Sequence, residues 1–375
     1  MTSLRDLYET GGQSPWIDNL KRSWLTGGYL GRLIESGVRG LTSNPTIMAK
    51  AIEEGSDYDD QFAESFGRHR NALDAYWDLV ITDVEGALTQ FGPLHRESGR
   101  RDGFVSIEVA PSLARDTAGT IEAARKLHER IARENLLVKI PASEEGIPAI
   151  RQMIAEGHSI NVTLIFSIER YEEVMEAYLS GLEEFIGNGG DPSTVASVAS
   201  FFVSRVDTET DRRLSALAES EPDSPRAVAA RSLRGKTAVA QARLAYERFQ
   251  RSVQSERWSR LEAAGARVQR PLWASTSTKN PDYPDLLYVE TLIGPDTVNT
   301  MPEGTIDAFL DHGHVARTID DFDHAREVLD QLAEVGVDLD DVAATLEQEG
   351  ITAFEKSFDE VNERLENKTA QLDQR

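Results

Sequence analysis

The sequence contains no cysteine among its 375 residues. Disulfides, thiolate metal sites and cysteine nucleophiles are therefore excluded together. There is also no run of about 18 consecutive apolar residues, the length expected of a membrane-spanning helix. The first ten residues have no apolar core like that of a secretory signal. We therefore expect a cytoplasmic protein with no membrane partner.

Positive charge is scarce. The formal net charge is -24, whereas nucleic acids and anionic membranes are bound by basic surfaces, so we expect neither as a partner. If the substrate carries phosphate, cations must be concentrated locally against this overall charge. Only eight of the 40 basic residues are lysines, so a lysine within an apolar strand is conspicuous. Apolar residues make up 40% of the chain, enough for a large buried core.

A glycine-rich phosphate loop is missing as well. Neither G-x-G-x-x-G nor G-x-x-x-x-G-K-[ST] occurs, which disfavours an open nucleotide-binding sheet. Instead, short apolar segments alternate with longer amphipathic ones about eight times, which predicts an α/β fold, a (β/α)8 TIM-type barrel. The predicted strands are residues 16–20, 38–42, 104–109, 136–141, 160–165, 194–203, 267–274 and 297–301. Predicted helical regions between them include residues 58–91, 112–134, 167–186, 225–264 and 305–311.

After about residue 318 the pattern becomes purely helical and acidic. We expect helices over residues 322–335, 339–349 and 353–368. The predicted organisation is a catalytic barrel domain over residues 1–318 and a helical C-terminal extension over residues 319–375, packed on the outside of the barrel.

A lysine interrupts the fourth predicted strand. Lys139 is flanked by Leu136, Leu137, Val138 and Ile140, so it is either an edge residue whose amine reaches solvent or a buried amine. Burial disfavours the charged form of a lysine. A neutral amine can attack a ketone and form an iminium, the electron sink that lets a carbon–carbon bond break. Because barrels of this type have their active site at the carboxyl ends of the strands, Lys139 is the candidate nucleophile.

Other charged residues fall in or after predicted strands. Asp18 and Glu108 could supply the proton transfers that carbinolamine dehydration and aldol cleavage need. The alternative for each is a salt bridge or a helix cap. Arg205 and Lys279 follow late strands, where such barrels commonly bind phosphate; the alternative is a pair of surface charges.

Buried polar groups at strand ends suggest a functional role, because burying one without a hydrogen-bond partner costs about 1–3 kcal/mol. Asn161 and Thr163 alternate along one predicted strand and should point to the same face. The remaining residues that we assign to the site are Asn44, Ser200, Phe202 and Ser277. His312 and His314 have the spacing of a metal pair but no third ligand nearby, so we expect no metal site.

Five segments together resemble the transaldolase family. They are Leu41-Thr-Ser-Asn-Pro-Thr-Ile47, Ser106-Ile-Glu-Val-Ala110, Val138-Lys-Ile-Pro-Ala142, Ile160-Asn-Val-Thr-Leu-Ile-Phe-Ser167 and Val203-Ser-Arg-Val-Asp207. They occur in the order and at the spacing of that family. The region around Lys279 and the acidic helical tail resemble its longer bacterial subgroup.

The resemblance implies a barrel of the Schiff-base aldolase class with no metal or organic cofactor. By position, Lys139 matches the Schiff-base lysine of the family. Glu108 matches the acid that works with Thr163 and a bound water in proton shuttling, and Asp18 matches the acid/base of carbon–carbon cleavage.

The resemblance also implies a set of substrate contacts. Residues that hold the hydroxyls of a dihydroxyacetone unit match Asn44, Asn161 and Ser200, and the main phosphate ligand matches Arg205. Lys279 departs from the pattern, because many members carry a second phosphate arginine there. Lysine can supply the charge but not the bidentate fork.

Three functions remain open on the sequence. The first is transfer of dihydroxyacetone from sedoheptulose 7-phosphate to glyceraldehyde 3-phosphate, giving erythrose 4-phosphate and fructose 6-phosphate, in the pentose phosphate pathway. The second is a related Schiff-base lyase that releases free dihydroxyacetone; such lyases have tyrosine in place of Phe202 and glutamine in place of Glu108. The third is a catalytically silent barrel that binds sugar phosphates. The expected partners are sugar-phosphate substrates, and the expected state is a monomer or homodimer.

Overall fold

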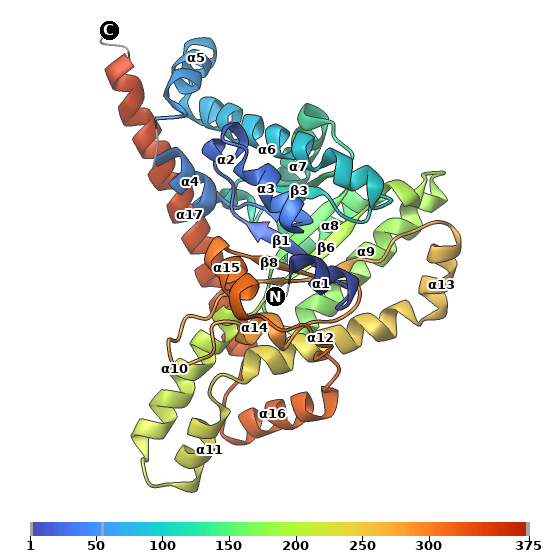
Figure 1. Ribbon diagram of the computed structural model, residues 1–375, viewed down its shortest axis with the longest axis vertical. Helices are drawn as coiled ribbons and strands as arrows, with labels where there is room; N and C mark the ends of the chain where they lie inside the picture. Colours follow the sequence, from blue (N-terminus) through green and yellow to red (C-terminus); the bar gives the residue numbers. More distant parts are fainter. Residues whose placement is uncertain (1–2, 54–55, 373–375) are drawn as a thin grey trace.

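The strands form one closed parallel barrel. The structure is a computed structural model that describes residues 3–53 and 56–372, and in these residues eight parallel strands pair in chain order, with β8 closing against β1 (Figure 1). The predicted (β/α)8 barrel is confirmed. The strands are β1 (Gln13–Asp18), β2 (Gly40–Thr42), β3 (Phe104–Glu108), β4 (Leu136–Pro141), β5 (Ile160–Ile165), β6 (Ser197–Phe202), β7 (Arg270–Ala274) and β8 (Thr297–Met301).

Helices surround the barrel and fill the connections between strands. The first group is α1 (Leu4–Glu9), α2 (Arg22–Thr26), α3 (Tyr29–Ser36), α4 (Pro45–Glu53), α5 (Asp59–His69), α6 (Ala72–Glu97), η1 (Pro111–Leu113), α7 (Thr117–Ile131), α8 (Gly146–Ala155) and α9 (Ile168–Gly187). The second is η2 (Pro192–Thr194), α10 (Ser204–Ser220), α11 (Pro225–Leu233), α12 (Thr237–Val253), α13 (Glu256–Ala263), α14 (Leu287–Glu290), α15 (Glu303–His312), α16 (Phe322–Glu334) and α17 (Leu339–Leu372). Among the described residues, no helix is long and apolar enough to cross a membrane.

The first strand begins three residues before its predicted start. Gln13 and Ser14 are polar, which is why the apolar pattern did not include them, yet both are fully buried and pair with β8. The Gln13 amide donates to the carbonyl of Leu292 and to Thr297 Oγ1, at 2.7 and 2.9 Å. Because these hydrogen bonds replace those to water, the polar side chains can lie inside the barrel.

A glycine at the start of β2 makes room for an indole ring in the adjacent strand. A Cβ atom at position 40 would lie 2.4 Å from the ring of Trp16, which is fully buried. Any residue with a Cβ atom at position 40 would clash with the Trp16 ring, so glycine is needed for β1 and β2 to pair here. Their pairing brings the last residues of the two strands, Asp18 and Thr42, side by side.

The C-terminal segment forms one long helix. The prediction of two separate helices over residues 339–349 and 353–368 was wrong, because α17 runs without a break through Gly350. A Cβ atom at position 350 would lie 3.1 Å from Leu164 and 3.5 Å from Arg205, so glycine lets the helix approach both. Figure 1 shows α17 passing α10 and α4 along one side of the barrel.

Candidate active site

A cavity of about 210 Å³ lies at the carboxyl ends of the strands. Several of its lining residues are the last in their strand, including Asp18, Thr42, Phe202 and Ala274. Of the residues that the sequence assigned to the site, those that line the cavity are Asp18, Asn44, Lys139, Thr163, Ser200, Phe202, Arg205, Ser277 and Lys279. The barrel and the loops that follow its strands therefore gather residues that are far apart in the chain, from Asp18 to Pro302.

Lys139 is a buried amine, not an edge residue. Its side chain is 6% exposed, and Nζ lies 3.0 Å from Oε2 of Glu108, whose side chain is 3% exposed. Nζ also donates to the carbonyl of Ser43 at 3.1 Å. Burial raises the pKa of the Glu108 carboxyl, and the charge of Lys139 opposes that rise. The acid therefore lies within reach of the amine for proton transfer.

Asp18 occupies the end of β1, where Thr42 orients it. Thr42 Oγ1 donates to Asp18 Oδ1 at 2.7 Å and lies 2.6 Å from Thr300 Oγ1. Burial raises the pKa of Asp18, while the hydrogen bond from Thr42 and then the charge of Lys139 lower it. The raised pKa suits a carboxyl group that takes up and releases a proton.

Three side chains, from β3, β5 and β6, form a hydrogen-bonded row. Ser200 Oγ donates to Asn161 Oδ1 at 2.7 Å, and Asn161 Nδ2 donates to Ser106 Oγ at 3.0 Å. Asn161 is fully buried and its amide is used at both ends, whereas Ser200 lines the cavity. The row therefore fixes the position that Ser200 presents to a ligand.

The hydroxyl of Thr163 has no partner within the described part of the chain. Its Oγ1 is fully buried, and the residue lines the cavity. The next residue, Leu164, has φ of +58°, and the pairing of β5 with β6 shifts between Val162 and Ile165. Such a backbone costs on the order of 1–3 kcal/mol in a branched residue and is concentrated at functional sites. A substrate or a water molecule would satisfy this hydroxyl.

Two cations share one side of the cavity. The guanidinium of Arg205 lies 5.3 Å from the ring of Phe202 and 6.0 Å from that of Phe354. Lys279 donates to Ser277 Oγ at 2.7 Å. Burial lowers the pKa of Lys279, and the charge of Arg205 lowers it further. Within the described residues Arg205 forms no direct ion pair with a carboxylate, although the charges of Glu349 and Asp18 act on it, so its guanidinium can bind an anion.

Asn44 follows β2 and begins α4. Its Oδ1 accepts a hydrogen bond from the backbone N–H of Ile47 at 3.0 Å, as a helix-capping side chain does. Its amide nitrogen has no partner among the described residues and is available to a ligand.

Several residues of the cavity were not predicted from the sequence: Thr42, Ala274, Ser275, Thr300, Pro302 and Phe354. Thr42 stands in the Thr-Ser-Asn-Pro motif and could have been found from it. No sequence pattern indicated that Phe354 belongs to the cavity, because it reaches the cavity from α17, about 150 positions after Arg205. The histidines 312 and 314 lie away from the cavity, against Asp285, Asp311 and Glu290.

Comparison with known proteins agrees with this geometry. The family model described as transaldolase/fructose-6-phosphate aldolase matches residues 15–365. The chain belongs to the transaldolase/fructose-6-phosphate aldolase family. A protein named transaldolase from Thermobifida fusca is 48% identical over 362 residues, which cover 96% of each chain. Proteins of the same name from Saccharopolyspora erythraea and Arthrobacter sp. are 47% and 46% identical, over 97% and 96% of this chain and 96% of each relative.

Family membership confirms the resemblance carried by the five motifs. It also connects the motifs to the cavity, because each of them contributes a side chain to the cavity or to its immediate surroundings. The family name covers both transfer and lyase chemistry, so the choice between them rests on the residues of this site.

Proposed function

We propose that this protein is a transaldolase that transfers dihydroxyacetone from sedoheptulose 7-phosphate to glyceraldehyde 3-phosphate through a Schiff base on Lys139. The products are erythrose 4-phosphate and fructose 6-phosphate. The observation that carries the proposal is the contact of 3.0 Å between Glu108 Oε2 and Nζ of Lys139, which lines the cavity together with Asp18. The proposal includes action in the cytoplasm, as a monomer or homodimer.

The Schiff base forms in two steps. Glu108 takes a proton from the Lys139 ammonium, and burial of the carboxyl favours this transfer because it raises the pKa of Glu108. The amine then attacks the C2 ketone to give a carbinolamine, which loses its hydroxyl as water when Glu108 returns the proton. Thr163, whose hydroxyl has no partner among the described residues, can orient that water.

Cleavage uses the second carboxylate. Asp18 takes the proton of the C4 hydroxyl, the C3–C4 bond breaks, and its electron pair moves into the iminium to leave an enamine on Lys139. The shortened aldose phosphate departs as an aldehyde. The enamine then attacks the acceptor aldehyde, Asp18 returns the proton to the new hydroxyl, and hydrolysis by the reverse of the first stage frees Lys139.

Arg205 and Lys279 are the residues that we expect to bind the phosphate group of the substrate. Arg205 and Lys279 lie on the same side of the cavity and would bind the phosphate group at the end of the sugar opposite the keto group. Arg205 can bind phosphate with two parallel hydrogen bonds, whereas Lys279 adds a single charge. A local positive site of this kind is needed in a chain with a net charge of -24.

Phe202 favours transfer over release of free dihydroxyacetone. The ring lies at the end of β6, is 7% exposed and lines the cavity. It has no hydroxyl to orient a water molecule or deliver a proton, so the enamine should persist until an aldehyde arrives. A silent sugar-phosphate binder is disfavoured by Lys139, since binding alone requires no buried amine beside an acid.

The test is the yield of dihydroxyacetone per fructose 6-phosphate consumed, with and without erythrose 4-phosphate. We expect negligible dihydroxyacetone from fructose 6-phosphate alone and fast turnover when the acceptor is added. In Phe202→Tyr the released fraction should rise while the Schiff base still forms. Steady release by the unmodified protein, unaffected by acceptor, would identify a lyase instead.

A further inference from the structure

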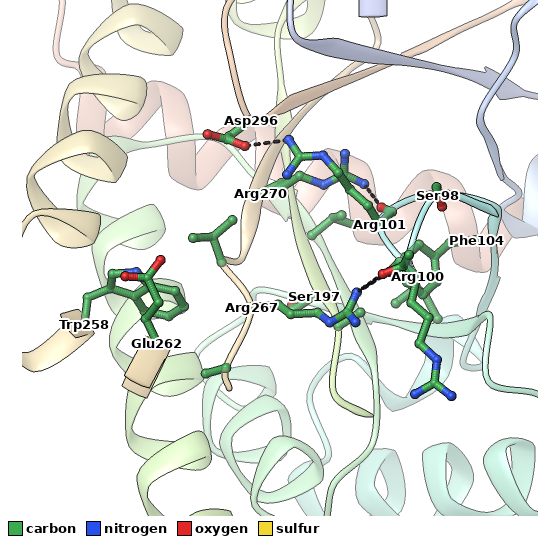
Figure 2. Close-up of a pocket in the computed structure, with 16 residues that line it drawn as sticks. Ser98, Arg100, Arg101, Phe104, Ser197, Trp258, Glu262, Arg267, Arg270 and Asp296 are labelled. Carbon is green, nitrogen blue, oxygen red and sulfur yellow. Dashed lines mark hydrogen bonds and ion pairs between the residues drawn. The ribbon is translucent and has the colours of Figure 1, made fainter. Parts of the chain in front are cut away.

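A second cavity, of about 450 Å³, lies at the opposite end of the barrel. It opens where strands begin, because its lining includes Phe104, Ser197 and Arg270, the first residues of β3, β6 and β7. Figure 2 shows the connection between α6 and β3 on one side and Trp258 and Glu262 of α13 on the other. None of its lining residues belongs to the cavity around Lys139.

Four arginines line this cavity, in a chain whose net charge is -24: Arg100, Arg101, Arg267 and Arg270. Two of them are neutralised. Arg101 Nη2 lies 2.5 Å from Asp296 Oδ1, and the buried Arg270 lies 3.2 Å from Asp102 Oδ1. The other two, Arg100 and Arg267, add positive charge beside the carboxylate of Glu262, which also lines the cavity.

Arg267 is fixed by backbone carbonyls. Its Nε donates to the carbonyl of Ser193 at 3.1 Å. Its Nη1 donates to the carbonyls of Gly99 and Arg100 at 3.0 and 2.7 Å (Figure 2). No carboxylate pairs with it among the described residues. Burial lowers the pKa of Arg267, and the nearby charge of Arg100 lowers it further. The fold therefore holds a guanidinium in place without neutralising it.

Among the described residues, Arg100 forms only an exposed ion pair, with Glu134. It lies 3.2 Å from Glu134, but the two side chains are 44% and 72% exposed. Exposed ion pairs of this kind contribute little, so Arg100 can turn toward a ligand at small cost. Its backbone carbonyl accepts a hydrogen bond from Arg267, and its charge is near enough to lower the pKa of Arg267.

Apolar side chains form another part of the cavity wall. Phe104, Leu137, Val198 and Trp258 line it and are all buried. The Nη2 group of Arg267 has no partner among the described residues, so its two N–H groups can donate to a phosphate. The cavity thus combines an apolar surface with more arginines than carboxylates, since Glu262 and Asp296 are its only acidic lining residues among those described.

We propose that this second cavity binds the phosphate group of a small phosphorylated metabolite, at Arg267 and Arg100. The site would be separate from the Schiff-base lysine. The proposal does not depend on the transaldolase reaction, and its test does not use turnover.

The test is calorimetric titration with inorganic pyrophosphate. Arg205→Ala serves as the background, because it removes the phosphate ligand proposed for the other cavity. This variant should still bind one pyrophosphate per chain. Adding Arg267→Gln should weaken that binding by about tenfold or more. The control is Arg260→Gln, which removes the same charge from an exposed position of α13 that does not line the cavity and should leave the affinity unchanged.

Arg267→Gln could also disturb the fold, since Arg267 joins three backbone carbonyls. Arg100→Gln provides a second variant, because its side chain is exposed and should be replaceable without loss of structure. It too should weaken pyrophosphate binding, by about threefold or more. Absence of binding in the Arg205→Ala background, or equal affinities in Arg100→Gln and Arg260→Gln, would overturn the proposal.

Discussion

Glu108 and Lys139 are directly paired residues of two neighbouring strands, and their charged atoms lie 3.0 Å apart. Because they are in register in parallel strands, both side chains leave the barrel wall at the same height and on the same side. The pairing of β3 with β4 therefore places the carboxyl group of Glu108 beside the amine of Lys139. Neither side chain depends on a mobile loop for its position.

The two carboxylates should have separable roles. In Glu108→Gln the acid that takes and returns the Lys139 proton is lost, so Schiff-base formation should slow by about 100-fold or more. In Asp18→Asn the Schiff base should form, but carbon–carbon cleavage should slow by a similar factor. Single-turnover trapping and aldehyde release measure the two steps. The opposite pattern would require the two roles to be exchanged.

Arg205 should discriminate between phosphorylated and unphosphorylated donors. Arg205→Ala should reduce kcat/KM for fructose 6-phosphate. The reduction should correspond to a loss of about 2–4 kcal/mol of transition-state stabilisation, because a charged hydrogen-bonding partner of the phosphate is lost. The loss should largely vanish with fructose, which has no phosphate. Equal losses on both donors would mean that Arg205 serves the fold and not the phosphate.

Phe354 should support Arg205 from the long C-terminal helix. Its ring lies 6.0 Å from the guanidinium, and contacts of this type contribute about 0.5–2 kcal/mol. Phe354→Ala should therefore raise KM for fructose 6-phosphate by about 2- to 30-fold with a smaller effect on kcat.

Phe358→Ala is the matched control for that variant. Phe358 lies on the same helix and is similarly buried, but it packs on Tyr76 and Trp77 and does not line the cavity. Both variants should lose stability through cavity formation, and only Phe354→Ala should change KM. The same KM in both variants would show that Phe354 is a packing residue only.

Asp207 should make the stability of the protein depend on pH. Its carboxylate is buried and accepts hydrogen bonds of 2.8 Å from the N–H of Ala238 and the hydroxyl of Tyr288. Burial raises the pKa of Asp207 to about 7. A carboxyl whose pKa is raised on folding favours the folded state below its unfolded pKa of about 3.9, and this contribution is lost as the pH rises through the folded pKa.

Relative to Asp207→Asn, the unmodified protein should lose roughly 2–3 kcal/mol of unfolding free energy between about pH 5 and pH 8. Asparagine keeps the acceptor for the N–H of Ala238 and has no charge to bury. Urea unfolding of both proteins at the two pH values gives the difference. If that difference is the same at both pH values, Asp207 is ionised in the folded state throughout this range.

The barrel could be predicted from the sequence because its strands are short apolar segments between longer amphipathic ones. Three strands, Leu136–Pro141, Ile160–Ile165 and Thr297–Met301, have the predicted bounds. The predicted ends of strands and helices were less accurate where the local sequence pattern differs from the burial in the fold. Buried Gln13 looks polar in sequence, and Gly350 looks like a helix end although packing of α17 against Leu164 and Arg205 carries the helix through it.

The site was predictable to the extent that its residues lie in or after strands. Lys139 stood out as a charge in an apolar strand, and the barrel geometry then gathers the other strand ends around it. The burial of its amine and the contact with Glu108 required the structure, because they depend on the register between β3 and β4. Phe354 could not be predicted, since nothing in a helical pattern indicates which distant strand the helix will cover.

The central claim is a covalent bond between Lys139 and the substrate. The most direct measurement is the intact mass and peptide map of the protein after borohydride treatment with fructose 6-phosphate. The account predicts one substrate-derived adduct per chain, located on Lys139, and no adduct in Lys139→Ala. An adduct of undiminished yield in Lys139→Ala, or one located on another lysine, would contradict it.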